Sequence, residues 1–411
     1  MKEAASPADA GGDLIVSGTP AFRRANLAMF AAGLSTFALL YCVQPLMPAF
    51  SAEFGIGAAE SSLSLSVSTG LLAFGMLVAS SLSESWGRKP VMVASLLVSA
   101  VLILLSSLMQ GWHGFLLVRA LAGITLSGLP AVAMAYLSEE MHPRAIGLAM
   151  GLYIGGSALG GMAGRLGTAV LTDAFSWRFA VAAIGVAGIA AGLVFWRSLP
   201  ESRQFRARAL RPRAMLDAFA DHIRDPGLRL LFLQGFLLMG GFVTLYNYIS
   251  YRLLAPPYEV SQTVVGAIFT VYLIGSASSI LVGDLAGKVG RRKVLWATIV
   301  IMIMGLGLTM ADGLAVIVLG IAVLTFGFFG AHSTVSSWVG RRALHARAQA
   351  SSLYLFFYYL GSSVVGSAGG FFWSAWGWGG VVGLIGILLV VALSIALRLA
   401  VLKPIAQPAG A

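Results

Sequence analysis

Three ionisable residues lie inside long apolar runs of this sequence: Arg119, Arg165 and His332. A charged side chain is costly to bury in such a run, so it is usually functional or paired with another group. No Asp or Glu falls at the centre of any run. Two guanidinium groups without a nearby carboxylate suggest an anion site as one interpretation, because arginine binds anions through paired hydrogen bonds. The alternative is that each arginine bonds backbone carbonyls or extends towards water.

The composition shows that the elements holding these residues must face lipid. Of 411 residues, 58% are hydrophobic and only 10% are charged, and the mean hydropathy is +0.88. A soluble domain carries about a quarter charged residues. The single cysteine, Cys42, excludes an internal disulfide. Residues 1–24 lack the short apolar core of a secretory signal, and we expect them to form a loose tail.

The apolar runs have the length of membrane-spanning helices, which need about 20 residues each. They lie near 25–46, 61–82, 90–110, 114–137, 146–171, 179–197, 230–250, 262–282, 294–311, 314–338, 350–373 and 380–402. Helices are expected because an open strand would leave backbone groups unbonded in lipid. The sequence predicts an all-α membrane protein with 12 transmembrane helices in two six-helix bundles. Its predicted parts are a tail (1–24), a bundle (25–197), a connector (198–229), a bundle (230–402) and a tail (403–411).

The basic residues indicate how the helices are oriented. Every Lys and Arg lies at the end of the bundles that holds both termini, except Arg119, Arg165, Arg178 and Arg252. Such a bias marks the cytoplasmic side. We therefore expect a multi-pass protein of a bacterial inner membrane with both termini in the cytoplasm. The same bias explains the net charge of +11 without nucleic acid, although basic residues of the connector could hold anionic lipid.

One kind of basic turn occurs twice. "SLSESWGRKP" (81–90) and "GDLAGKVGRRK" (283–293) each lie between the second and third run of their half. A repeat at half the chain length indicates two homologous bundles related by an axis along the membrane normal. Glycine supplies the backbone freedom of a short turn, and the basic residues keep the turn in the cytoplasm.

The repeated turn resembles the pattern G-x-L-a-D-r-x-G-r-k of the major facilitator superfamily, and the resemblance covers residues 22–403. "FALLYCVQPLMPAF", "YLSEEMHP", "LPESR" and "QASSLYLFFYYLGSS" resemble its arabinose-efflux-permease-like branch. The first copy departs at Ser80 and Glu84, and the second has Gly287 at the acidic position. The resemblance implies a conformational switch made by the two turns: Glu84, Gly87, Arg88 and Lys89, with Gly283, Asp284, Gly290 and Arg291.

In that switch, the resemblance implies that Glu84 pairs with Arg88 near the start of the eleventh span, around Ser351 and Ser352. A contact that forms in only one conformation would act as a latch. The alternative is a surface charge pair that contributes little beyond topology.

The resemblance also implies roles for residues within the spans. Arg119 and Gly123 match the fourth-span pattern R-x-x-x-G, whose arginine is linked to proton coupling in the superfamily. The first, seventh and tenth spans line the superfamily's cavity. We therefore expect a substrate-binding set that contains Tyr41, Gln44, Arg119, Arg165, Gln234, Tyr246, Asn247 and His332. His332 could carry a proton, because the unperturbed pKa of imidazole is about 6.5, or it could be a packed hydrogen-bonding residue. The aromatic cluster from Tyr354 to Tyr359 could be packing or a ligand cage.

Glycines line one face of the fifth run, namely Gly156, Gly160 and Gly164, with Gly161 beside them. Such a face allows another helix backbone to approach closely. We expect the partner to be the eighth span, which contains Gly275. "GSALGG" also resembles the superfamily's antiporter signature, with Ser157 replacing Pro.

These features predict a monomeric secondary transporter of a small organic molecule that works by alternating access, by proton-coupled efflux. Two alternatives remain open: an organic-anion carrier that uses Arg119 and Arg165, and a non-transporting membrane sensor. The expected partners are the substrate, membrane lipids and, for coupled transport, protons. No metal-ligand spacing, nucleophile–base set or phosphate loop is present in the sequence, so we expect no cofactor, no metal and no enzyme.

Overall fold

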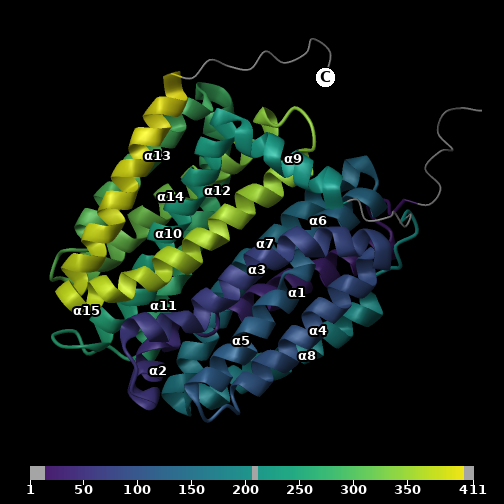
Figure 1. Ribbon diagram of the computed structural model, residues 1–411. Coiled ribbons are helices and arrows are strands. Elements are labelled where there is room, and N and C mark those ends of the chain that lie inside the picture. Colours follow the sequence, from purple (N-terminus) through teal and green to yellow (C-terminus); the bar gives the residue numbers. More distant parts are fainter. Residues whose placement is uncertain (1–13, 206–211, 402–411) are drawn as a thin grey trace, which may run out of the picture.

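The computed structural model of the protein describes residues 14–205 and 212–401, which are helical almost throughout (Figure 1). The all-α fold predicted from the apolar runs is confirmed. The helices of the first half are α1 (Pro20–Tyr41), η2 (Gln44–Leu46), α2 (Met47–Phe54), α3 (Ala58–Trp86), α4 (Arg88–Ser106), α5 (Trp112–Leu126), α6 (Gly128–Glu140), α7 (Pro143–Ala174) and α8 (Trp177–Ser198). Those that follow are α9 (Pro212–Arg224), α10 (Pro226–Leu254), α11 (Gln262–Ile268), η3 (Phe269–Val271), α12 (Tyr272–Val289), α13 (Arg291–Leu308), α14 (Leu314–Arg342) and α15 (Arg347–Val401).

Local capping groups fix where several helices begin. Thr19 precedes Pro20 and accepts a hydrogen bond from the amide of Phe22 at the start of α1. Asp225 caps α10 in the same way through the amide of Leu228. A side-chain oxygen at this position satisfies an amide that has no partner within the helix. Proline fits the first turn because its missing N–H would be unpaired there.

Ten helical stretches in the described ranges are long and apolar enough to cross a membrane. α13 is not among them and begins with Arg291, Arg292 and Lys293. α15 has 55 residues and kinks at Gly377, where φ is 58° and ψ is −145°. Figure 1 draws it as two rods, yellow-green and yellow, that meet at one end. α13 and these two rods match the apolar runs 294–311, 350–373 and 380–402.

The repeated turn has the same backbone in both halves. Gly87 separates α3 from α4 with φ 99° and ψ 152°, and Gly290 separates α12 from α13 with φ 96° and ψ 134°. Residues with a Cβ rarely adopt these angles. The glycine at each turn is therefore required by the chain reversal between two adjacent helices.

The helices of residues 20–198 and those of residues 226–401 form two neighbouring groups (Figure 1). In the first group α1 packs on α7, α3 on α5 and α4 on α8. In the second, α10 packs on α15, and α14 packs on α12 and α13. The groups meet mainly where α3 contacts α15 and where α7 contacts α11.

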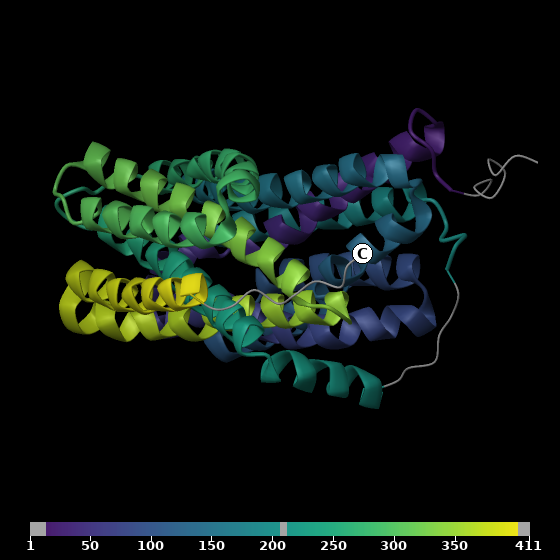
Figure 2. The same ribbon diagram turned by 90° about the horizontal axis from the view of Figure 1, so that it is seen from above.

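The connector between the groups contains the amphipathic helix α9. It follows the grey trace in Figure 2 and lies at the margin of the molecule. It packs on α10 and α15. Its His222 is buried, with Nε2 3.1 Å from the carbonyl oxygen of Ala346 and its ring stacked on His345. The connector is thereby fixed to the second group.

Candidate functional site

Arg165 on α7 lies at the centre of a buried hydrogen-bond network between the two groups. Its Nε donates to Oε1 of Gln44 at 2.6 Å, and its Nη1 donates to the carbonyl of Gly161 at 2.7 Å. Nε2 of Gln44 donates in turn to Oδ1 of Asn247 on α10 at 2.7 Å. The structure therefore brings together three residues of the predicted binding set: Gln44, Arg165 and Asn247.

Aromatic rings surround the Arg165 guanidinium. Its Cζ lies 4.0 Å from the ring centroid of Tyr41, 4.8 Å from that of Tyr272 and 5.1 Å from that of Phe269. A desolvated cation–π contact is worth about 2 kcal/mol. Tyr41 belongs to the predicted set, whereas Phe269 and Tyr272 were missed. Nothing in their local sequence distinguishes them from lipid-facing aromatic residues.

The charge of Arg165 has no carboxylate partner in the described part of the chain. The side chain is only 2% exposed, and burying a charge without an ion pair costs several kcal/mol. Nδ2 of Asn247, in the same network, has no hydrogen-bond partner among the described residues. The Arg165 charge and the Asn247 N–H without a partner among the described residues suit an anionic group. The surrounding aromatic rings suit a ligand whose remainder is flat and apolar.

Tyr246 adjoins this network, but Gln234 does not join it. The Tyr246 ring stacks on Phe269 with centroids 5.1 Å apart, and its hydroxyl lies 2.8 Å from Oγ1 of Thr325. Gln234 instead donates from Nε2 to the carbonyl of Ala392 at 2.6 Å, which joins α10 to α15.

His332 on α14 lies among the aromatic residues of α15. Its Nδ1 is 2.8 Å from the hydroxyl oxygen of Tyr354, and its ring centroid is 4.7 Å from that of Tyr358. The ring also stacks on Phe328. His332 is half-buried. The predicted aromatic cluster thus encloses an imidazole.

Arg119 on α5 is fully buried and bonds backbone carbonyls. Its Nε donates to Ser64 at 2.8 Å, Nη2 to Leu40 at 2.9 Å and Nη1 to Leu39 at 3.4 Å. Ser68 donates from Oγ to the carbonyl of Arg119 itself at 2.7 Å. Arg119 therefore joins α1, α3 and α5 through backbone carbonyls, which is the predicted alternative to an anion site.

The glycine face of α7 packs on α1, not on the eighth span as predicted. A Cβ added at Gly156, Gly160 or Gly164 would overlap backbone atoms of Phe30, Leu34 or Ala38, respectively. Gly161 faces the Arg165 side chain instead. The prediction of the partner was wrong because Gly275 on α12 already packs against Phe329 of α14. Glycine spacing indicates close approach of a helix but not which helix approaches.

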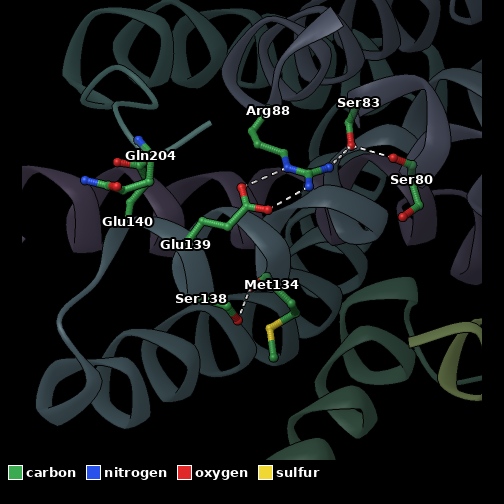
Figure 3. Close-up of polar contacts among 8 residues, drawn as sticks. All are labelled: Ser80, Ser83, Arg88, Met134, Ser138, Glu139, Glu140 and Gln204. Carbon is green, nitrogen blue, oxygen red and sulfur yellow. Dashed lines mark hydrogen bonds and ion pairs between the residues drawn. The ribbon is translucent and has the colours of Figure 1, made fainter. Parts of the chain in front are cut away.

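The first basic turn forms a partly buried ion pair, although not with the predicted carboxylate (Figure 3). Arg88 donates from Nε to Oε2 of Glu139 at 3.0 Å and from Nη2 to Oε1 at 2.7 Å. Its Nη1 donates to Oγ of Ser83. Glu84 makes no ion pair or hydrogen bond with described residues. The predicted Glu84–Arg88 pair is wrong because Arg88 begins α4 and extends towards the end of α6.

Contacts of the same region fix the start of the connector. Glu140 accepts hydrogen bonds from the backbone amides of Arg203 at 3.0 Å and Gln204 at 2.9 Å. Lys89 pairs with Glu201 at 2.7 Å. The turn between α3 and α4, the end of α6 and the connector are therefore held together.

The second basic turn repeats this geometry without its ion pair. Arg291 begins α13 and donates from Nε to Oγ of Ser337 on α14 at 3.1 Å. Asp284 pairs with Lys288 on its own helix at 2.6 Å, and both side chains are exposed. Gly283, which the resemblance implies in the switch, lies within α12. The ion pair of the second turn therefore stabilises the fold less than that of the first, because an exposed pair contributes little.

A separate forked ion pair joins α10 to α14. Arg342 donates to Asp225 from Nε at 2.6 Å and from Nη2 at 3.0 Å. Burial acts to raise the pKa of Asp225, but the bonds from Arg342 and from the amide of Leu228 outweigh it and hold the pKa below its usual range. This carboxylate is therefore charged at neutral pH.

At the end opposite the basic turns, several hydrogen bonds close the two groups on each other. Ser51 and Tyr251 lie 2.7 Å apart through their hydroxyl oxygens. Asp173 accepts from the backbone amides of Gln262 at 3.2 Å and Thr263 at 2.7 Å. Their partners come from opposite halves of the chain, so this end of the interface is sealed by direct contacts.

Comparison with known proteins agrees with this architecture. The family model described as "Major Facilitator Superfamily" matches this sequence at residues 27–259 and 246–410. The chain is 53% identical over 385 residues to the Escherichia coli (strain K12) "Inner membrane transport protein YnfM", which covers 94% of this chain and 92% of that protein. It is 51% identical over 379 residues to the Bacillus subtilis (strain 168) "Uncharacterized MFS-type transporter YybF", which covers 92% of this chain and 94% of that protein.

A solved structure with a similar fold is the bacterial homologue of the human lysosomal transporter Spinster, in an inward-facing and unoccupied conformation. The TM-score is 0.75 at 15% identity, with 93% of this chain and 98% of that chain covered. At this identity the likeness concerns the fold alone.

Proposed function

The chain belongs to the Major Facilitator Superfamily and is a multi-pass membrane transporter, and from this premise we propose that it moves a small organic molecule by alternating access. Its relatives are transporters, so the protein is not an enzyme. In alternating access, two halves of the molecule rock about a central site that opens to one side at a time.

The proposed topology has twelve crossings and two bundles, residues 25–197 and 230–402, with the connector 198–229 between them. Support comes from the ten apolar stretches, of which α15 contains two rods and so can cross twice. The additional helix α13 supplies the remaining crossing. The excess of Lys and Arg at one end supports cytoplasmic termini in a bacterial inner membrane. The direct contacts at the opposite end support an inward-facing or closed state.

We assign the central site to the cluster around Arg165 and the substrate to the small organic anions. The observation that carries this assignment is that Arg165 is buried without a carboxylate partner among the described residues. Gln44 orients the guanidinium, and the free Nδ2 of Asn247 supplies a second donor. The rings of Tyr41 and Tyr272 favour a flat apolar body on the anion. In this proposal Arg119 positions helices and does not contact the substrate.

We further propose that the protein exports its substrate and that export is coupled to protons. The likeness of several stretches to efflux permeases supports export. The central part of the described spans offers no carboxylate as proton carrier, which leaves His332, beside Tyr354, as the candidate. If His332 carries the proton, His332→Asn retains substrate binding but loses the response of flux to a pH gradient.

A transport assay in proteoliposomes tests the function. Purified protein is reconstituted with an internal panel of aromatic carboxylates and their uncharged amides, with and without an imposed pH gradient. The proposal predicts flux of at least one carboxylate, little flux of its amide and faster export when the gradient is applied. Flux of the amides alone would refute the anion assignment, and flux unaffected by the gradient would refute proton coupling.

A further inference from the structure

A polar cavity lies at the basic end of the first group, outside the network of Arg165. Its volume is about 480 Å³. It is lined by the N-terminal segment and the first turns of α1, the start of α4, the ends of α6 and α8, and the start of the connector. Figure 2 shows the purple N-terminal segment and the teal connector at the same end of the molecule.

Backbone hydrogen bonds build the walls of this cavity. Ile15 pairs with the segment after α6, donating to the carbonyl of Glu140 at 2.8 Å and accepting from the amide of His142 at 3.0 Å. On the other side, the Glu140 carboxylate bonds the amides of Arg203 and Gln204. The N-terminal segment and the connector are therefore both fixed to α6, so the cavity is a formed feature of the fold.

Basic side chains dominate the charge around this cavity. Arg24, Arg197 and Arg203 line it and make no ion pair with any described residue. Lys89 also lines it and is neutralised by Glu201. Arginine recognises phosphate through paired hydrogen bonds, so the chemistry of the lining fits a phosphate group.

The surroundings of the cavity favour a lipid as the source of that phosphate. One helical turn deeper than Arg24, Leu27 on α1 is 69% exposed. One turn deeper than Arg197, Val194 on α8 is 58% exposed. α1 and α8 pack together, so both neighbouring helices carry an exposed apolar side chain just below the basic residues, where acyl chains can lie. Trp196, half exposed, has the amphipathic character typical of the headgroup level.

We propose that this cavity binds the phosphate headgroup of an anionic phospholipid, with Arg24 and Arg197 as its principal contacts. The site is separate from the transport site. The cavity lies between the N-terminal segment, several helix ends of the first group and the start of the connector, so a bound lipid stabilises their contact at the membrane surface.

A lipid titration of the full-length protein in detergent tests the proposal. Thermal-shift curves give apparent Kd values for dioctanoyl phosphatidylglycerol, dioctanoyl phosphatidylcholine and inorganic phosphate. Near an anionic headgroup, each basic side chain contributes about a fivefold factor in affinity. The double variant Arg24→Gln/Arg197→Gln is therefore expected to weaken phosphatidylglycerol binding on the order of 25-fold, and Arg24→Lys/Arg197→Lys is expected to retain most of it.

The control is Arg229→Gln/Arg398→Gln, which removes two exposed arginines of the second group at the same end. This variant is expected to bind phosphatidylglycerol like the unaltered protein. Equal weakening in both double variants would show general attraction to a basic surface and overturn the site. Inorganic phosphate that binds as tightly as phosphatidylglycerol would overturn the lipid assignment. Unchanged binding in Arg24→Gln/Arg197→Gln would refute the proposal, provided that this variant elutes as a folded species.

Discussion

Replacing Arg165 with glutamine is expected to weaken anion binding with little loss of stability. The guanidinium is buried among Tyr41, Phe269 and Tyr272 and makes two hydrogen bonds, but it has no carboxylate partner in the described chain. A hydrogen bond between charged groups is worth about 1.5–3 kcal/mol. Since about 1.4 kcal/mol of binding free energy corresponds to a tenfold change in Kd, loss of one such hydrogen bond to the substrate raises the Kd by roughly 10- to 150-fold.

The stability of Arg165→Gln separates a binding role from a structural one. Removing a buried charge without an ion pair relieves a desolvation cost that offsets the lost hydrogen bonds and cation–π contacts, and a glutamine can still contact Gln44. The apparent Tm of the substrate-free variant should therefore fall much less than that of Arg119→Gln, which leaves three buried backbone carbonyls without their donors. The Kd is measured by equilibrium binding of an aromatic carboxylate that the transport screen identifies, with Arg165→Lys as the variant that keeps the charge. An unaltered Kd in Arg165→Gln, or a large fall in Tm with unaltered affinity, would refute the reasoning.

Three further predictions concern the scaffold. Arg119→Gln removes donors to the carbonyls of Ser64, Leu39 and Leu40 and should destabilise the protein by roughly 3 kcal/mol, seen as a lower apparent Tm; an unchanged Tm would show that these bonds contribute little. Glu139→Gln should cost about 1–2 kcal/mol, discounted because Glu139 is 33% exposed, whereas Glu84→Gln should leave the Tm unaltered; equal effects would contradict the reassigned ion pair. Gly160→Val should abolish a monodisperse elution profile because its Cβ would meet the backbone of Leu34, whereas Gly151→Val, which faces open space, should be tolerated; tolerance of both would contradict the α1–α7 packing.

Composition and periodicity were sufficient to predict the helical fold and the repeated turn. Hydropathy identifies the spans because lipid imposes one requirement on every helix. Gly87 and Gly290 were recognised from the repeated basic turn, and their positive φ angles explain why glycine is needed there. Polar side chains are rare in apolar spans, which singled out Arg165. The resemblance to the superfamily, whose first and seventh spans line its cavity, brought Gln44 and Asn247 into the same candidate set.

The partners of these features required the tertiary structure. Arg88 and Glu139 are 51 residues apart, and their pairing depends on how the end of α6 lies beside the turn. The glycine face of α7 could serve any small-residue helix, and its packing on α1 follows from the arrangement of the whole group. Phe269 and Tyr272 were missed because an aromatic residue in an apolar run carries no local sign of which way it faces.

The central claim, that the two groups rock about the Arg165 cluster, is tested most directly by distances measured at both ends of one molecule. Paired spin labels are introduced by Leu148→Cys with Leu285→Cys at the basic end and by Phe175→Cys with Val264→Cys at the opposite end, in a Cys42→Ser background. The account predicts that a transported anion moves the two distance distributions in opposite directions, one shortening as the other lengthens. Distances that stay fixed at both ends during measured transport would contradict alternating access.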